Sequence, residues 1–579
     1  MSATTISQYG PRPTHRPPVL ARHMAVASGH YLATDAGMRI LRQGGNAIDA
    51  GVAAGICIDV LMPDQCNFGG VAPIIIYHQQ TGDLVSISGL GPWGRSATLE
   101  HFVEHENGQI PFGVKRSVVP GAPDSWLTAL ARYGRLTFEE VVQPAIELCE
   151  GGHVVYGVHE AGIAAALERI RAWPSSSIVF LRDGMPIPAG DVIYQNDLAT
   201  TFRRMVAAER SAGGGRAAGI EAARDEFYIG DIGKEIAAFI QSEGGFVSEE
   251  DLADFHSDIE SPPMTTYRGV DVFSCGPWCQ GPVLLQALNI LEGYDLSELG
   301  HNSADYVHIV AEALNLAFAD RERFYGDPKF VDVPLEALIS KAYASQRREM
   351  LDPERAFGQM AEHGQITGFQ RYALPFEMVT AEVREPDTSY VCVIDEAGNA
   401  FSATPSDGVG NSPLVPGLGL ICSSRGSQSW LIPEHPSVVA GGKRPRLTPN
   451  PAIAFRDGQL FMPFGTPMSD MQPQAMLQTF LNIVDFEMDV QAAIEAPRLK
   501  TSSHPETFWP HTYRPGRLNL EGRFPREVGD DLAARGHDIN WWPAYTDHAG
   551  KMCAIVVDHA RGTLAAGADV RSEAYAAGW

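Results

Sequence analysis

The residue best placed to act as a catalyst is a threonine. It lies where an irregular connector meets a buried strand. Residues 352–387 are charged, contain Gly and Pro and show no hydrophobic period, whereas Tyr390–Asp395 alternate as a strand does. Thr388 opens that strand, and scission before it would give a hydroxyl nucleophile whose own α-amino group acts as base. Thr is also common in strands, so this spacing alone is weak support for catalysis.

Other residue types that often carry chemistry are scattered. Of the eight cysteines, only Cys275 and Cys279 lie close together, and no second pair or His cluster accompanies them. We therefore expect free thiols. His504 and His511 lie in a loop rich in Pro and aromatic residues, where a metal site is equally unexpected. The sequence implies no metal and no organic cofactor.

Composition excludes several classes of partner. The chain has 579 residues, 44% of them hydrophobic, and 70 Asp and Glu against 44 Lys and Arg, a formal net charge of −26. Such acidity argues against nucleic acid or an anionic membrane as the main partner and otherwise aids solubility. The first thirty residues hold no apolar stretch of signal-peptide length, and no window approaches the roughly 18 apolar residues of a membrane span. We expect a cytoplasmic protein.

The elements before Thr388 are predicted to be mainly helical. Residues 33–64 show two helical periods joined at Gly44-Gly45-Asn46, which predicts a helix hairpin. Residues 71–89 predict two strands that meet at a turn around Gly82. Between about 120 and 350, apolar residues recur at three- and four-residue spacing, and the connector 352–387 is predicted to be exposed.

The elements after Thr388 follow a period of two. A strand over 390–395, a turn at 396–399 and a strand over 400–404 predict a buried hairpin. Further strands in 451–465, a helix over 471–486 and a final strand at 553–558 complete an α+β region. No internal repeat is evident.

The order and text of many segments resemble the γ-glutamyltransferases, also called glutathione hydrolases. The resemblance covers nearly the whole chain, and its ordered matches are too many for chance. They include LATDAGMRILRQGGNAIDAGVAA, the NFGG turn, VPGAPDSW, VVQPAIELCEGG, TYRGVDVFSCGPWCQGPVLLQALNILEGYDL, AFADRERFYGDP, DTSYVCVIDEAGNAFSATPSDG, GKRPRLTPNPAI, GTPMSDMQPQAMLQ, AIEAPR and GADVRSEAYAAGW.

This resemblance implies a four-layer αββα sandwich of the N-terminal nucleophile hydrolase type. It also implies an inactive precursor cut between Asp387 and Thr388, giving a large fragment, 1–387, and a small fragment, 388–579, that form one intertwined domain. The two fragments would be partners in a heterodimer, and association of two heterodimers is left open. The other expected partner is a small-molecule amide substrate, with neither nucleic acid nor membrane.

Two reactions would use the same threonine. In the precursor, the Thr388 hydroxyl attacks the carbonyl of Asp387, the peptide becomes an ester, and water releases Thr388 with a free α-amino group. That amine titrates near pH ~7.7–8, so a useful fraction is neutral and can accept the hydroxyl proton. In the mature enzyme, Thr388 attacks the substrate amide and forms an acyl-enzyme.

The oxyanion donors of the family are backbone N–H groups of a Gly-Gly pair, which Met468 and Ser469 replace here. Backbone donors survive a change of side chain, but a positive φ would cost a non-glycine residue about 1–3 kcal/mol. Ser469 either adds a hydroxyl donor or is an ordinary turn residue.

The residues that support the nucleophile and substrate are partly retained. Ser406 and Gly408 match the Thr and Asn that follow the family's nucleophile, so Ser406 keeps a hydroxyl able to orient Thr388. Of two hydroxyls that help to bind the substrate carboxylate, Thr448 remains and Leu447 takes the other place.

The family's residues that bind the α-amino and α-carboxylate groups of a γ-glutamyl substrate are replaced here. The family's Arg falls near Leu99, and its acidic residue falls near Gln428. Arg425 and Arg95 lie near the same motifs and would pair with a substrate carboxylate differently; alternatively, each is a solvated or structural arginine.

The leading hypothesis is a self-cleaving threonine amidohydrolase with a remodelled acyl pocket. It would hydrolyse an amide of a small carboxylic acid, or of a γ-glutamyl compound, through an acyl-enzyme on Thr388, with hydrolysis favoured over transfer. The alternative is a catalytically silent relative that binds a metabolite or has a structural role. Self-cleavage discriminates between the two.

Overall fold

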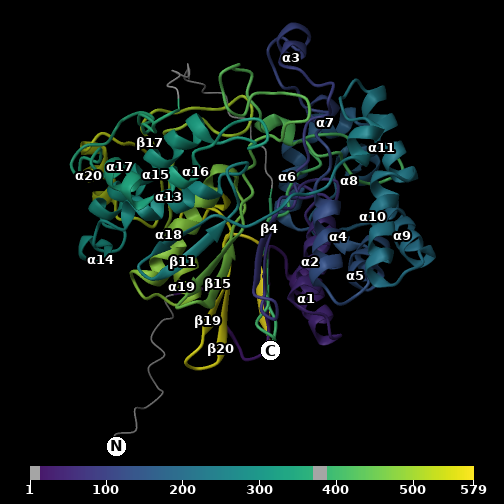
Figure 1. The fold of residues 1–579 in the computed structure, drawn as a ribbon, viewed down its shortest axis with the longest axis horizontal. Helices are drawn as coiled ribbons and strands as arrows, with labels where there is room; N and C mark the ends of the chain where they lie inside the picture. Colours follow the sequence, from purple (N-terminus) through teal and green to yellow (C-terminus); the bar gives the residue numbers. More distant parts are fainter. Residues whose placement is uncertain (1–13, 370–387) are drawn as a thin grey trace, which may run out of the picture.

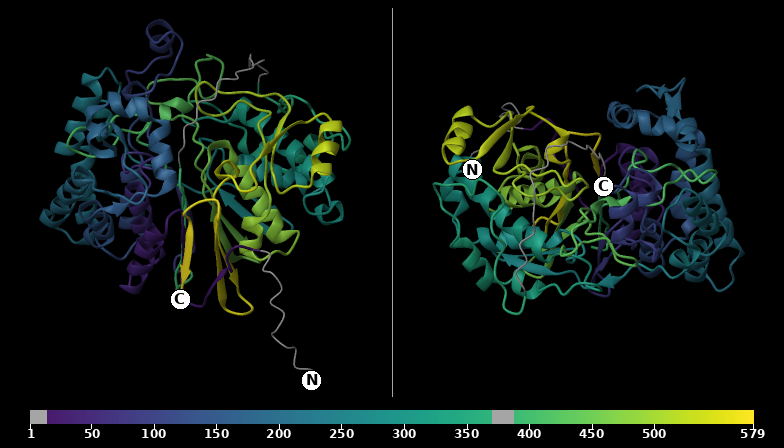
Figure 2. Two further views of the ribbon diagram at one scale, coloured as in Figure 1. Left: turned by 180° about the vertical axis from the view of Figure 1, so that it is seen from behind. Right: turned by 90° about the horizontal axis from the view of Figure 1, so that it is seen from above.

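The computed structural model describes residues 14–369 and 388–579. Two seven-stranded sheets lie at its centre, and helices cover the outer face of each sheet (Figures 1 and 2). This arrangement is a four-layer αββα sandwich and confirms the predicted α+β class. No helix within the described ranges is long and apolar enough to cross a bilayer.

The first sheet is built mainly from residues that follow Thr388. All its pairings are antiparallel. In spatial order its strands are β1 (Val19–Ala21), β20 (Thr563–Ala568), β19 (Cys553–Asp558), β15 (Gln459–Gly465), β14 (Ala452–Arg456), β11 (Val270–Ser274) and β10 (Met264–Tyr267).

The second sheet joins the two ends of the chain to the hairpin that follows Thr388. It is also antiparallel throughout. In order its strands are β21 (Tyr575–Gly578), β2 (Ala25–Ser28), β12 (Val391–Ile394), β13 (Ala400–Ala403), β3 (Ile74–His78), β4 (Asp83–Ile87) and β9 (Ile259–Glu260).

Helices from the first half of the chain cover the second sheet. Helices α1 and α2 pack directly on it, and the others pack against α2 and one another. Helix α2 is buried along its whole length and begins with a capping box between Asn46 and Asp49. Their bounds are α1 Tyr31–Arg42, α2 Ala47–Leu61, α4 Ala122–Tyr133, α5 Phe138–Gly151, α9 Asn196–Ser211, α10 Arg216–Tyr228 and α11 Asp231–Ser242.

The first sheet is covered by helices from both halves of the chain. Helices α13, α18 and α19 pack on its strands, and α15 and α17 pack behind α13. Their bounds are α13 Gly281–Leu291, α15 Ala304–Phe324, α17 Lys341–Arg348, α18 Gln472–Val484 and α19 Val490–Glu495.

Shorter elements lie around this frame. A three-stranded sheet contacts α20 through β18, and a small helical group, α6 to α8, contacts the short strands β6 and β7. Their bounds are α3 Leu99–His105, α6 Gly157–Ala165, α7 Leu167–Ala172, α8 Pro174–Phe180, α12 Glu249–Ala253, α14 Leu296–Leu299, α16 Leu335–Leu338, α20 Arg526–Ala534, β5 His153–Val154, β6 Leu181–Arg182, β7 Met185–Pro186, β8 Val192–Ile193, β16 Leu499–Thr501, β17 Arg517–Glu521 and β18 Asp538–Trp542.

The two sheets share an apolar interior, which ties the strand after Thr388 to the rest of the protein. Tyr390 and Cys392 of one sheet pack in the same core as Ile453 and Ile555 of the other. At roughly 25 cal/mol per Å² of apolar surface removed from water, this layer contributes strongly to stability. Residues from before and after Thr388 therefore contribute to the same sheets and to the same core.

Most predicted elements are confirmed, with two corrections. The strand at 553–558 is not the final one, because β20 and β21 follow it. The connector 352–387 is predicted to be exposed, but within its described part Ala361 is buried and Gly364 donates its N–H to Asp320 Oδ1 at 2.7 Å. The connector's last part, 370–387, lies outside the described residues.

Candidate functional site

Thr388 lies three residues before the first residue of β12 and is fully buried. The β12–β13 register pairs Val391 with Ala403, so three further steps along the hairpin bring Thr388 opposite Ser406. Their hydroxyl oxygens lie 2.6 Å apart, and the Thr388 backbone N–H donates to the carbonyl of Gln65 at 2.8 Å. The hairpin thus explains why a supporting hydroxyl follows eighteen residues after the threonine.

The backbone at Thr388 is strained. Its φ is +82°, a left-handed value that β-branched residues rarely adopt. Such a conformation costs on the order of 1–3 kcal/mol and persists only where the surrounding structure enforces it. Scission of the preceding peptide bond would remove the torsion and release this strain.

A buried charge cluster lies behind Ser406. The Arg425 guanidinium donates to Ser406 Oγ and pairs with Asp407, with Nε and Oδ1 3.3 Å apart. Asp407 also accepts hydrogen bonds from the hydroxyls of Ser423 and Ser424, each at 2.6 Å. Because a guanidinium can only donate, Ser406 is the acceptor there and its own O–H is available to Thr388.

Gln428 and Thr448 extend the same chain of hydrogen bonds. With the Gln428 amide oriented to match its neighbours, its oxygen accepts from Thr448 Oγ1 at 2.8 Å and from Arg425 Nη1 at 3.1 Å, and its nitrogen donates to the Arg446 carbonyl at 3.2 Å. The structure thus brings together Ser406, Arg425, Gln428 and Thr448 beside Thr388, although their roles toward substrate stay predictions.

Met468 and Ser469 form the turn expected to hold the oxyanion. Their φ values are +90° and +46°, so the chain keeps a left-handed backbone although neither residue is glycine. The turn is half-buried and leads through a short 3₁₀ turn, Ser469–Met471, into α18. The Met468 carbonyl accepts from the N–H of Met471 at 2.8 Å, which anchors the peptide between Met468 and Ser469.

A cavity of about 150 Å³ lies between this turn and the segment of Asp64 and Gln65. The Gln65 carbonyl is the group that accepts from the Thr388 N–H. One wall is helix α6, which contributes only small or aliphatic residues. Gly162 is required there, since a Cβ at this position would lie 2.7 Å from the Cβ of Asp64. The lining residues are Asp64, Gln65, Gly157, Val158, Ala161, Gly162, Ala165, Met468, Asp547 and Lys551.

Lys551 and Asp64 are charged residues of this cavity that sequence reasoning missed. The Lys551 ammonium donates to Gln65 Oε1 at 3.1 Å, and Gln65 Nε2 donates to Asp64 Oδ2 at 3.1 Å. Within the described residues, Asp64 Oδ1 has no hydrogen-bond partner, and no carboxylate lies within 4 Å of the Lys551 ammonium. Both side chains are 4% exposed, so the protein buries two opposite charges without pairing them.

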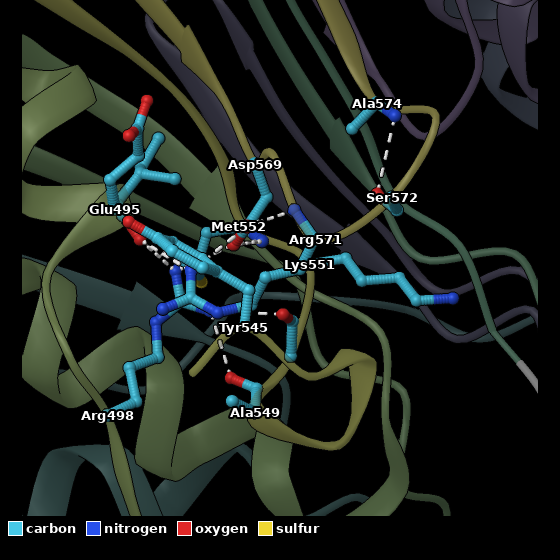
Figure 3. Close-up of polar contacts among 12 residues, drawn as sticks. Glu495, Arg498, Tyr545, Ala549, Lys551, Met552, Asp569, Arg571, Ser572 and Ala574 are labelled. Carbon is cyan, nitrogen blue, oxygen red and sulfur yellow. Dashed lines mark hydrogen bonds and ion pairs between the residues drawn. The ribbon is translucent and has the colours of Figure 1, made fainter. Parts of the chain in front are cut away.

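The backbone around Lys551 is rigidly held. Its N–H donates to Thr466 Oγ1 at 2.7 Å, and Arg498 Nη1 donates to the carbonyls of Ala549 and Gly550. Figure 3 shows the Lys551 side chain leaving this network and pointing away from Arg498 and Asp569. Only tertiary contact brings Lys551 near Thr388, so the sequence offered no local signal for it.

Burial sets the electrostatics of the cavity. It raises the pKa of Asp64 to about 6, against the opposing effect of the Lys551 charge. Burial also raises the pKa of the nearby Glu573 carboxyl and, with the charge of Asp64, that of the Tyr156 hydroxyl. The charged form of Asp64, which lines the cavity, is therefore costly unless a partner of complementary polarity is present.

Arg95 and Leu99 lie apart from this cluster. Arg95 lines a different cavity, of about 310 Å³, and its guanidinium pairs with Asp254 at 2.6 Å and with Asp251 at 3.8 Å. It is largely exposed, and two carboxylates of the chain already neutralise it. Leu99 begins α3 at the partly exposed surface. A role for Arg95 in substrate binding stays a prediction.

The cysteines and the loop histidines are engaged in packing. All eight cysteines are buried free thiols, as predicted. His504 stacks on Phe318 with ring centroids 3.7 Å apart, and His511 stacks on Trp430 at 3.6 Å. Over the described ranges, no group of three or more His, Cys, Asp or Glu residues has the geometry of a metal site.

Comparisons with known proteins give a consistent answer. Residues 33–579 match the sequence model of the gamma-glutamyltranspeptidase family. The chain is 31% identical to the glutathione hydrolase-like YwrD proenzyme of Bacillus subtilis, over 97% of this chain and 99% of that one. It is 33% identical to the acylase ACY 1 proenzyme of a Pseudomonas species, over 95% and 92%.

A solved structure shares the whole fold. The cephalosporin acylase from Bacillus halodurans superposes with a TM-score of 0.85 at 29% identity, covering 100% of this chain and 99% of that one. Sequence and fold therefore agree along the full length, and this chain belongs to the gamma-glutamyltranspeptidase family of self-processing N-terminal nucleophile amidohydrolases.

Proposed function

We propose that Thr388 is the nucleophile of this amidohydrolase and that the precursor cuts itself between Asp387 and Thr388. The observation that carries the proposal is the contact between the Thr388 and Ser406 hydroxyls, 2.6 Å apart just before β12, with Arg425 behind Ser406. Asp387 lies outside the described residues. The products would be fragments 1–387 and 388–579, held together by the sheets that they share.

In the first reaction, Thr388 Oγ1 attacks the carbonyl carbon of Asp387. The C–N bond breaks, an ester forms, and the departing nitrogen takes a proton to become the α-amine of Thr388. Water then cleaves the ester and leaves a carboxylate on Asp387 and a free hydroxyl on Thr388. The strained φ of +82° favours this direction, because the free amine no longer has that torsion.

In the second reaction, the freed amine takes the hydroxyl proton as Thr388 attacks a substrate amide. The carbonyl of Gln65, which accepts from the Thr388 nitrogen at 2.8 Å, holds the amine in place. Ser406 orients the hydroxyl, and the backbone N–H groups of the Met468–Ser469 turn stabilise the oxyanion. The leaving amine takes a proton, and water hydrolyses the acyl-enzyme.

We propose that the acyl group is a short chain with a terminal carboxylate and no α-amino group. Arg425 is already committed to Asp407, Ser406 and Gln428, and Arg95 to Asp254, so neither is placed as the γ-glutamyl carboxylate clamp. Lys551, in the cavity at the Met468 turn, bonds the neutral Gln65 and keeps donors for an acceptor group. The named acylase relatives support an acyl group other than γ-glutamyl.

Intact mass spectrometry tests the cleavage. Purified wild type should yield fragments that begin at Thr388, Thr388→Ala should stay whole, and Thr388→Ser, which keeps the hydroxyl, should still cut. Wild type that remains whole on long incubation would overturn the proposal.

A matched pair of substrates tests the acyl group. Glutaryl and γ-glutamyl p-nitroanilide differ only in the α-amino group, so their kcat/KM ratio reports recognition of that group directly. We expect the glutaryl compound to react at least tenfold faster. Preference for the γ-glutamyl compound would contradict the proposed acyl class while leaving the nucleophile intact.

A further inference from the structure

Gln280 is a buried amide that connects two parts of the proposed site. It directly precedes α13 and is 1% exposed. Its Nε2 donates both to the Ser469 carbonyl at 3.0 Å and to the Thr448 carbonyl at 2.9 Å. A single side chain thus holds the oxyanion turn and the segment that carries Thr448.

The orientation of this amide is fixed from behind. Arg321, fully buried, donates from Nη1 to Gln280 Oε1 at 2.9 Å and to Asp470 Oδ1 at 2.5 Å. Because the guanidinium has no acceptor, the amide oxygen must face it, and the amide nitrogen must face the two carbonyls. Asp470 also accepts from the N–H and the hydroxyl of Thr507, so the ion pair is itself anchored.

The turn needs such an anchor because its residues are not glycines. Left-handed backbone costs a non-glycine residue on the order of 1–3 kcal/mol, and here Met468 and Ser469 both adopt it. The Met468 carbonyl is held by the N–H of Met471, and the Ser469 carbonyl is held by Gln280. In a trans peptide the N–H points opposite the C=O of the same peptide, so the bond to the Met468 carbonyl fixes the direction of the Ser469 N–H. Gln280 holds the next peptide, between Ser469 and Asp470, and so fixes the end of the turn that follows this donor.

We propose that Gln280 is a positioning residue that keeps the Met468–Ser469 turn in its left-handed conformation and so maintains the oxyanion donors without glycine. The inference rests on the proposed function, since it assumes that this turn faces the acyl group on Thr388. Loss of the amide donor lets the turn relax toward negative φ, which turns the N–H groups away. The transition state loses its donors while substrate binding elsewhere is preserved.

The main test is Gln280→Met, which has nearly the same shape and no donor. We expect kcat to fall about 10- to 100-fold while KM changes less than threefold. Removing an oxyanion donor outright costs about 100-fold or more in kcat, and here the donors are misdirected rather than removed. Gln286→Met is the matched control: Gln286 lies on α13, the helix that Gln280 precedes, and its side chain bonds Asp320 and Tyr325, not the turn. It should leave kcat within twofold of wild type.

Recovery of kcat by glycine at the turn tests whether backbone strain there causes the loss. In the Gln280→Met background, Met468→Gly with Ser469→Gly should recover at least tenfold in kcat, because glycine adopts positive φ without strain. If Gln280→Met blocks self-cleavage, the glycine pair should restore cleavage by the same logic. No loss in Gln280→Met, an equal loss in Gln286→Met, or no rescue by the glycine pair would overturn the inference.

The proposed function is checked separately in the same experiment. Wild type must first show fragments beginning at Thr388 and turnover of a p-nitroanilide. If it does not, the nucleophile proposal fails before any Gln280 variant is compared.

Discussion

The two sides of Thr388 are built differently. On one side, Ser406, Asp407 and Arg425 are fully buried, and the charge of the guanidinium is matched by a carboxylate that also receives two serine hydroxyls. On the other side, Lys551 and Asp64 are also buried, yet each bonds the neutral Gln65 rather than the other. Lys551, Gln65 and Asp64 line the cavity of about 150 Å³.

This difference separates two tasks. A dry cluster with matched charges is preorganised and does not change when a substrate arrives, which suits the fixing of a nucleophile. Buried charges that are not directly paired destabilise the empty protein, because the Lys551 charge offsets only part of the desolvation of Asp64. They become favourable when a ligand with complementary groups enters, which suits the recognition of a substrate.

The largest expected effect is on stability, at the matched side. Arg425→Met leaves Asp407 buried without its cation, and breaking a buried pair in this way typically costs about 3–5 kcal/mol. We expect the free energy of unfolding to fall by that amount, measured by urea denaturation in the uncleaved Thr388→Ala background. Arg95→Met, which removes an exposed guanidinium, is the control and should cost at most about 1 kcal/mol. Equal losses in the two variants would contradict the role given to Arg425.

The next effect has the opposite sign and lies on the unmatched side. Burial raises the pKa of Asp64 to about 6, above its ordinary value of 3.8. Between these values the native state binds more protons than the unfolded state, so stability falls as pH rises from about 4 to 6. Asp64→Asn removes this penalty and should stabilise the uncleaved protein by up to about 3 kcal/mol at pH 7.5, with little change at pH 4.

Urea denaturation at the two pH values measures this difference. Asp547→Asn removes a half-buried carboxylate from the same cavity and serves as the control for charge removal. A gain from Asp64→Asn that is equal at both pH values would show that the raised pKa is not its origin.

The sequence predicts the matched side well and the unmatched side poorly, for a physical reason. The hairpin after Thr388 is local: alternating apolar residues and a turn set its register, and that register places Ser406 opposite Thr388. Lys551 and Gln280 reach the site only through the packing of distant elements. No periodicity records such a contact.

The same reasoning explains the missed strands. Strand β20 reads Thr563–Ala568, TLAAGA, and its small residues carry little β-propensity. It forms because β1 and β19 flank it and its alternate residues pack between the two sheets. Strands β2 and β21, from opposite ends of the chain, likewise depend on pairing with each other.

The smallest predicted effect is also the sharpest test of the division between the two sides. Lys551→Met removes one hydrogen bond to Gln65 and the charge proposed to meet the acyl carboxylate. A hydrogen bond to a charged group contributes about 1.5–3 kcal/mol, so kcat/KM for glutaryl p-nitroanilide should fall roughly 10- to 100-fold, mainly through KM. Butyryl p-nitroanilide, which lacks the carboxylate, should lose less than threefold. If both substrates lose equally, Lys551 acts on the nucleophile through Gln65, and the unmatched side is then part of the catalytic frame rather than a recognition site.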